Sequence, residues 1–137
     1  MIFPEGITVY GDKSFRDKKC PKEALEQVTF FNKLRREYPA SFGLIAVHVR
    51  NEGKRTAHQV ARDKAEGMVT GAVDIMIPGG RTFLCELKRR DHTLSTIHDE
   101  QVDYLVAGQA AGAFSCIALG YQAAWEAFEE WLANSIA

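Results

Sequence analysis

The chain has 137 residues, of which 46% are hydrophobic and 26% are charged, and its formal net charge is −1. This length is typical of one domain that buries a core without metal or disulfide cross-links. The composition argues against a disordered chain, and a near-neutral charge gives no general attraction to nucleic acid. No run is apolar enough to predict a membrane span or a signal peptide, so we expect a cytoplasmic protein.

The first third of the chain predicts an arm followed by a helix. Residues 1–20 have no sustained period and predict an N-terminal arm with one short strand at 7–10. Pro21 suits the first turn of a helix, and Pro39 ends it. The apolar residues at helical spacing are Leu25, Val28, Phe31 and Leu34.

The middle of the chain predicts a strand, a loop and a second helix. Residues 42–49, FGLIAVHV, are continuously apolar and predict a buried strand. A polar loop follows, and residues 57–67, AHQVARDKAEG, predict a helix that ends at a glycine. Residues 71–78 and 81–88 then predict a β-hairpin, with Pro-Gly at positions 78 and 79 at the centre of a type II turn.

The last third predicts a helix, a strand and a helix. The first helix covers residues 97–112 with Ser95 or Thr96 as its N-cap, and the buried strand covers 113–120. The final helix covers 121–135. Its inward row is expected to be Trp125, Phe128 and Trp131 or Leu132, as core anchors or part of a dimer face.

These elements follow the order α-β-α-β-β-α-β-α, which predicts one α/β domain over residues 21–137 with a central mixed β-sheet and helices on both faces. The chain has three cysteines, Cys20, Cys85 and Cys116, without a C-x-x-C spacing. Cys85 and Cys116 lie in apolar runs, so we expect buried free thiols instead of zinc ligands or a nucleophile.

Charged residues interrupt both apolar runs of the hairpin, GAVDIMIP and RTFLCELK. Alternate residues of a strand share one face, so Glu86 and Lys88 face together and Leu87 faces away. Pairing across the turn brings them towards Asp74. Carboxylates inside a sheet need partners, and two on adjacent strands suit Mg²⁺, which binds oxygen ligands. The alternative is a structural salt bridge at a strand end.

Several stretches in a fixed order give this hairpin a wider context. Asp74, a hairpin and the E-x-K of ELK resemble the PD-(D/E)xK nuclease signature. KEALEQVTFFNKLRREYP, VHVRNEGKRT, KAEGMVTGAVDIMIP, FLCELKRRDHTLSTIHDEQVDYL and GAFSCIALGYQAAWEAFEEWL together resemble the VRR-NUC family of virus-type replication and repair nucleases. The resemblance covers residues 21–132.

This resemblance implies a restriction-endonuclease-like core and a DNA endonuclease that depends on Mg²⁺ or Mn²⁺. The metal would be bound by Asp74, Glu86, the Leu87 carbonyl and a glutamate of the first helix, which is Glu23 from its spacing to Gln27, with Glu26 as the fallback. Lys88 would orient or activate the attacking water, and Gln101 would support the site. The resemblance also implies a phage-type homodimer that acts in the host cytoplasm on branched, flapped or four-way-junction DNA.

Basic residues around this centre are candidate phosphate contacts: Lys54, Arg55, Arg62, Arg89 and Arg90. For the first three, a solvated basic face is the alternative. His92 and His98 follow the hairpin closely and are candidate substrate contacts.

The sequence departs from the family pattern at three points. Val73 replaces a proline before the aspartate, Glu52 replaces a small residue, and the stretch from Lys88 to Gln101 is longer than usual. Two other functions stay open: a non-catalytic nucleic-acid-binding module that keeps the nuclease fold, and a nuclease that cuts RNA.

Overall fold

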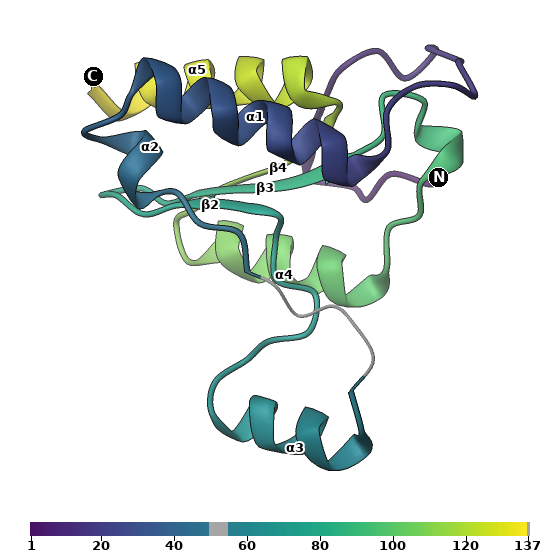
Figure 1. Ribbon diagram of the computed structural model, residues 1–137, viewed down its shortest axis with the longest axis vertical. Helices are drawn as coiled ribbons and strands as arrows, with labels where there is room; N and C mark the ends of the chain where they lie inside the picture. Colours follow the sequence, from purple (N-terminus) through teal and green to yellow (C-terminus); the bar gives the residue numbers. More distant parts are fainter. Residues whose placement is uncertain (50–54, 137) are drawn as a thin grey trace.

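The computed structural model describes residues 1–49 and 55–136 (Figure 1). The strands are β1 (Thr8–Tyr10), β2 (Ile75–Ile77), β3 (Phe83–Lys88) and β4 (Phe114–Leu119). The helices are α1 (Glu23–Glu37), α2 (Phe42–Ile45), α3 (Ala57–Ala65), α4 (Asp99–Ala110) and α5 (Tyr121–Ile136), with a 3₁₀ turn, η1 (His92–Leu94), before α4.

A mixed four-stranded sheet lies at the centre, in the order β1-β4-β3-β2. The β1–β4 and β4–β3 pairs are parallel, and β2–β3 is antiparallel. Helices α1 and α5 cover one face, α4 covers the other, and α3 stands apart beyond α4 (Figure 1). The predicted α/β class with a helix-flanked mixed sheet is therefore confirmed. No helix among the described residues is long and apolar enough to cross a membrane.

Strand β3 is buried along its whole length because helices cover both faces of the sheet. Phe83, Cys85 and Leu87 pack into the cluster under α1 and α5, whereas Leu84 packs into the cluster on the α4 side. By the alternation of a strand, Glu86 and Lys88 also point to the α4 side. Two ionisable side chains thus lie buried on one face of the strand, and the alternation predicted that they share this face.

Cys85 and Cys116 are buried and free, as expected, and Cys20 is also buried and free. Cys85 and Cys116 are register partners on β3 and β4, and both are fully buried. A hydrogen bond with Cys116, and then burial, raise the pKa of the Cys85 thiol. A buried thiol with a raised pKa is a poor nucleophile, which agrees with a structural role.

The strand predicted over residues 42–49 is wrong. Residues Phe42–Ile45 form the short helix α2, and Val47 makes a single β-bridge with Met76. The Phe42 ring packs edge-on against Tyr38, Phe128 and Trp131, with ring centroids about 5.5 Å apart. This aromatic packing turns the chain directly after α1 and overrides β propensity.

The row of α1 that faces the core is also shifted from the prediction. Leu25 and Val28 are more than half exposed, although Phe31 and Leu34 are buried as expected. The buried row is Glu26, Phe30, Phe31 and Leu34. An acidic residue is therefore the N-terminal member of the inward face of α1.

Two local predictions at turns and caps also fail. Ile77 pairs with Phe83, so residues 78–82 form a longer connection, and Gly79 lacks the positive φ that a type II turn requires. The N-cap of α4 is His98 instead of Ser95 or Thr96. Its backbone N–H donates to Gln101 Oε1 at 2.9 Å.

Phe128 lies at the centre of the larger core and is fully buried. We expect Phe128→Ala to lower the free energy of unfolding by about 3–5 kcal/mol, because it removes apolar contacts and leaves a cavity. Urea denaturation measures the change. Leu44→Ala is the control: Leu44 is 73% exposed, so its loss is expected to cost under about 0.5 kcal/mol. Equal losses for the two variants would contradict this core.

Candidate metal and catalytic centre

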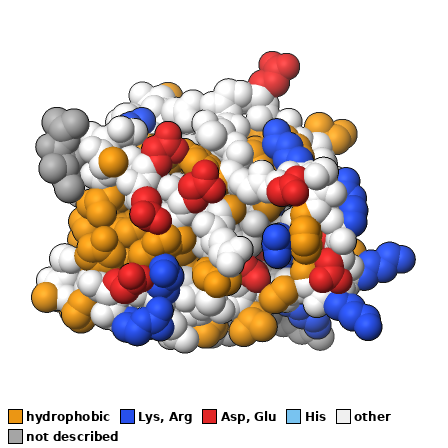
Figure 2. Space-filling model, turned by 90° about the horizontal axis from the view of Figure 1, so that it is seen from above, with side chains coloured by type: hydrophobic (Ala, Val, Ile, Leu, Met, Phe, Trp, Pro, Cys, Tyr) orange, Lys and Arg blue, Asp and Glu red, His pale blue; other side chains and the backbone are white. Residues whose placement is uncertain are grey.

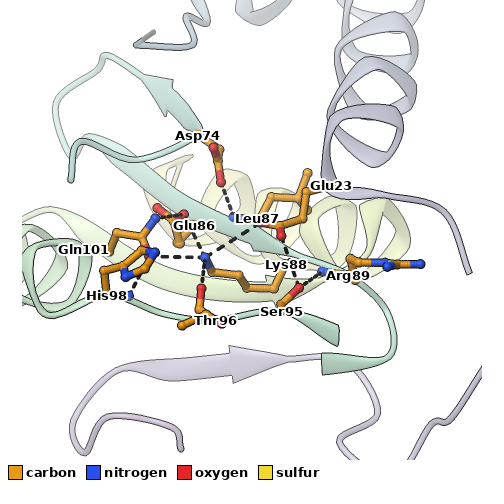
Figure 3. Close-up of polar contacts among 10 residues, drawn as sticks. All are labelled: Glu23, Asp74, Glu86, Leu87, Lys88, Arg89, Ser95, Thr96, His98 and Gln101. Carbon is orange, nitrogen blue, oxygen red and sulfur yellow. Dashed lines mark hydrogen bonds and ion pairs between the residues drawn. The ribbon is translucent and has the colours of Figure 1, made fainter. Parts of the chain in front are cut away.

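Asp74, Glu86 and Lys88 meet at the end of the hairpin away from its turn (Figure 3). Asp74 lies just before β2, and the last register pair of the hairpin joins Ile75 to Cys85. Residues 86–88 therefore extend β3 beyond its β2 neighbour. The Asp74 carboxylate takes the place of a strand partner there, and its Oδ2 accepts a hydrogen bond from the Leu87 N–H at 2.9 Å.

The Leu87 carbonyl faces the same edge of β3 as Asp74. On a strand, the N–H and the C=O of one residue point to the same side, and the Leu87 N–H points to Asp74. The next carbonyl, of Lys88, points the other way and accepts from Gly120 N–H at 2.9 Å. Leu87 thus offers an oxygen atom next to the carboxylates.

The backbone before Asp74 is held against the first turn of α4. Gly71 has φ +86°, and a Cβ there would lie 2.6 Å from the Glu100 carbonyl group. Only glycine suits both this conformation and this close approach. On the other side, His48 Nδ1 lies 2.9 Å from the Asp74 carbonyl oxygen. These contacts fix the position of Asp74.

Glu86 is 1% exposed, and its two oxygen atoms differ in their surroundings. Oε1 accepts from Gln101 Nε2 at 2.9 Å and lies 3.5 Å from Lys88 Nζ. Oε2 is buried and has no hydrogen-bond partner within the described residues. A buried carboxylate oxygen without a donor is costly, so it is a place where a cation would fit.

Lys88 Nζ is surrounded by oxygen atoms from three parts of the chain: α1, α4 and the segment before α4 (Figure 3). It donates to the Thr96 carbonyl at 2.7 Å and to Gln101 Oε1 at 3.2 Å, and it lies 3.7 Å from Glu23 Oε1. Gln101 therefore bridges Glu86 and Lys88 through the two ends of its amide. The structure brings Gln101 into the centre despite the longer stretch that precedes it.

The two candidate glutamates of α1 point to different places. Glu23 is partly exposed at the centre, near Lys88 and hydrogen-bonded by Ser95 Oγ at 3.2 Å. Glu26 is buried and accepts a hydrogen bond from Tyr121 N–H at the start of α5. Its negative charge there suits the positive end of a helix. Geometry thus places Glu23 at the centre and Glu26 in a capping contact.

Sequence reasoning missed two contacts that come from the segment between β3 and α4. Thr96 holds Lys88 through its carbonyl, and Ser95 Oγ links Glu23 to the Arg89 N–H, which donates to it at 3.0 Å. These residues lie in irregular structure, where no periodic pattern marks them. For Ser95 the available signal was a polar side chain close to E-x-K, whereas Thr96 acts through its backbone carbonyl, which no side-chain pattern records.

The surroundings of the centre raise the pKa of two of its carboxyl groups, Glu86 and Glu23, when no cation is present. Burial first, and then the charge of Asp74, raise the pKa of Glu86 from 4.5 to about 9, although Lys88 opposes the shift. Burial also raises the pKa of Glu23, with Lys88 opposing and Asp74 adding to the effect. A divalent cation would favour the ionised forms.

The donor set suits Mg²⁺ or Mn²⁺, which keep water and substrate oxygen atoms as ligands, better than a metal whose ligands are all protein side chains. No group of three His, Cys, Asp or Glu within residues 1–49 and 55–136 is arranged to hold a metal ion. Two carboxylates, Asp74 and Glu86, with the Leu87 carbonyl leave positions for water and a phosphate. Mg²⁺ is usually bound in this way, through one or two carboxylates and substrate oxygen atoms.

The centre opens into a cleft of about 1250 Å³. Helix α1, residues 46–49, residues 70–74 and the start of α4 line this cleft, and Asp74, Glu86 and Lys88 lie on its wall. The three side chains therefore border an open cleft.

The predicted phosphate contacts are spread over different surroundings. Lys54 lies outside the described residues. Arg55 pairs with Asp63 at 2.5 Å, and Arg62 is exposed on α3. Arg89 donates to the carbonyls of Pro21 and Cys20, and Arg90 lies over the Phe15 ring. Their contacts with DNA stay a prediction.

The two candidate histidines also differ. His92 is buried, with Nε2 3.0 Å from the Lys13 carbonyl oxygen, so its ring serves the N-terminal segment. His98 is exposed and lines the cleft.

No family model matches the chain, and no curated protein matches it. Among solved structures, the chain is similar to one described as a "VRR_NUC domain protein", with a TM-score of 0.70 and 17% sequence identity. The match covers 83% of this chain and 90% of that chain. The chain therefore has the fold of a VRR_NUC domain protein, as the sequence resemblance predicted.

Glu86 should make stability depend on pH when no divalent cation is present. Between pH 4.5 and about 9, the unfolded chain has lost this proton and the folded chain keeps it. The free energy of unfolding then falls as pH rises through this window. Each kcal/mol lost lowers Tm by about 4 °C. We expect melting curves in EDTA to show this fall for the wild type, and a smaller fall for Glu86→Gln. Identical slopes would contradict the burial of an ionisable Glu86.

The two α1 glutamates give a matched pair for stability. Glu26→Ala should lower the free energy of unfolding by about 1–2 kcal/mol, because the start of α5 loses a charged hydrogen-bond acceptor. Glu23→Ala should change it by less than about 0.5 kcal/mol, because Glu23 is partly exposed. Urea denaturation of both variants measures the difference. The reverse order would contradict the assignment of Glu26 to the capping contact.

Proposed function

We propose that the chain is a DNA endonuclease of the VRR-NUC type that uses Mg²⁺ or Mn²⁺ to hydrolyse phosphodiester bonds. The observation that carries this proposal is the buried Glu86 Oε2, which has no hydrogen-bond partner in the described residues and lies in a centre shared with Asp74 and Lys88. A structural salt bridge with Lys88 accounts for Oε1 only. Without a cation, the Glu86 carboxyl beside Asp74 needs a proton, and the proposal replaces that proton with a divalent cation bound by both acids.

Asp74, Glu86 and the Leu87 carbonyl would hold the ion, with Glu23 close enough to contribute directly or through water. When bound, such an ion supplies an activated water and stabilises the charge that develops on the phosphate. The chain supplies the fixed positions of these oxygen atoms. Gln101 and the Leu87 N–H each hold one carboxylate oxygen and leave the other available.

Lys88 would orient the attacking water or a phosphate oxygen. Its ammonium group already has oxygen neighbours from Thr96 and Gln101, so its position is fixed before substrate binds. In hydrolysis, the water loses a proton as its oxygen forms a bond to phosphorus, one bridging P–O bond breaks, and the leaving oxygen gains a proton. A fixed positive charge beside the phosphate lowers the barrier of this step.

The proposed substrate is branched DNA, such as a flap or a four-way junction, and the proposed assembly is a homodimer. A chain of 137 residues offers a small footprint on a duplex, and a two-fold dimer would place two centres on one junction. Both parts of this proposal come from the sequence resemblance.

The function is tested with labelled four-way junction, flap, single-stranded and duplex DNA, and with a matching RNA, in Mg²⁺, Mn²⁺ or EDTA. We expect cleavage of DNA that requires the metal. Asp74→Asn should lower kcat by about 10³-fold because it removes a charged ligand of the ion, and Lys88→Ala should lower it by a similar factor because it removes a positive charge beside the phosphate. Asp103→Asn, on an exposed position of α4, is the matched control and should cut like the wild type.

Intact DNA with either metal, together with binding that persists in EDTA, would instead favour the non-catalytic binding module. Cleavage of the RNA in preference to DNA would overturn the proposed substrate class.

A further inference from the structure

The segment before α1 is the most basic stretch of the chain. Residues 12–22 hold five basic residues, Lys13, Arg16, Lys18, Lys19 and Lys22, against two acidic ones, in a chain whose net charge is −1. Figure 1 places this segment beside the start of α1, and Figure 2 shows Lys and Arg side chains along the same edge of the molecule. None of these residues is among the predicted phosphate contacts.

Three of these cations, Lys18, Lys19 and Lys22, are exposed and unpaired. No ion pair or side-chain hydrogen bond of theirs lies within the described residues. The acidic residues of the segment are turned to its own backbone instead: Asp12 accepts from Ser14 N–H and Asp17 accepts from Lys19 N–H, each at 2.9 Å. The positive charge of the three lysines is therefore not neutralised locally.

The backbone that carries these lysines is held in place by the segment after β3. Asp17 N–H donates to Oδ2 of the buried Asp91 at 3.0 Å, and Arg89 Nε donates to the Pro21 carbonyl at 3.2 Å. The Lys13 carbonyl lies 3.0 Å from His92 Nε2. The segment is thus a fixed surface, and a partner would bind it without ordering it first.

This surface lies directly beside the catalytic centre. Lys22 precedes Glu23, and Arg89, which holds Pro21, follows Lys88. In duplex DNA, phosphates of one strand follow each other at about 3.4 Å along the helix axis. A strand that has its scissile phosphate at Lys88 and runs towards Pro21 would carry its next phosphates past the segment.

We infer that Lys18, Lys19 and Lys22 form a binding surface for the phosphates of the DNA strand that flanks the scissile bond. This inference rests on the proposed nuclease function. The contacts are to phosphates alone, so they give affinity and position without sequence preference. Their loss should raise KM and leave kcat unchanged.

The test compares two triple variants with equal charge change. Lys18→Gln/Lys19→Gln/Lys22→Gln removes the surface, and Lys33→Gln/Arg36→Gln/Arg81→Gln removes three basic residues from the far part of α1 and from the hairpin connection. Both are made in the Asp74→Asn background, so that a fluorescent four-way junction stays intact during anisotropy titrations over a range of KCl concentrations. The same triples without Asp74→Asn are used for cleavage kinetics.

The slope of log K against log [salt] is negative. We expect the first triple to make it shallower by about 2–3, since each phosphate contact contributes about −0.9. Its KM should rise about tenfold or more at an unchanged kcat, and Lys→Arg at the same positions should restore binding. The control triple should change the slope by less than about 1. Equal slopes for the two triples would overturn the inference and leave the nuclease proposal intact. Failure of the wild type to cut any DNA would instead defeat the proposed function.

Discussion

The central physical constraint on this structure is the free-energy cost of burying the Glu86 carboxylate next to a second acid, Asp74. At 1% exposure, this group has lost its water, and Asp74 adds repulsion. Lys88 and Gln101 offset part of that cost, but they reach only one of the two Glu86 oxygen atoms. The remaining oxygen gives the centre its preference for either a proton or a cation.

Much of the fold supports the pair of acids formed by Asp74 and Glu86. Strand β2 ends before β3 does, so a side chain replaces a strand at the edge and one backbone carbonyl is left facing it. Helix α4 brings Gln101, and the segment before it brings Ser95 and Thr96. Each of these parts places polar groups around Asp74, Glu86 and Lys88, at positions where a further strand or an apolar side chain would otherwise fill the space. The result is a rigid polar centre that remains open to a cleft.

The regular parts of this arrangement could be predicted from the sequence, and the irregular parts could not. Strand alternation placed Glu86 and Lys88 on one face, and pairing across the hairpin brought them towards Asp74. Helix periodicity did not separate Glu23 from Glu26, because the inward row of α1 is set by packing of Phe30 against α5, which no local pattern records.

The errors have similar causes. The apolar run at 42–49 resembled a strand, but the ring of Phe42 gains more from the aromatic cluster than the backbone would gain from a sheet edge.

The metal site is tested most directly by a crystal structure of the protein grown with Mn²⁺, with anomalous scattering recorded at the manganese edge. We expect an anomalous peak in contact with the carboxylates of Asp74 and Glu86 and with the Leu87 carbonyl. An ordered centre without a peak, with Glu86 Oε2 paired to a protein or water donor, would rule out the proposed metal site.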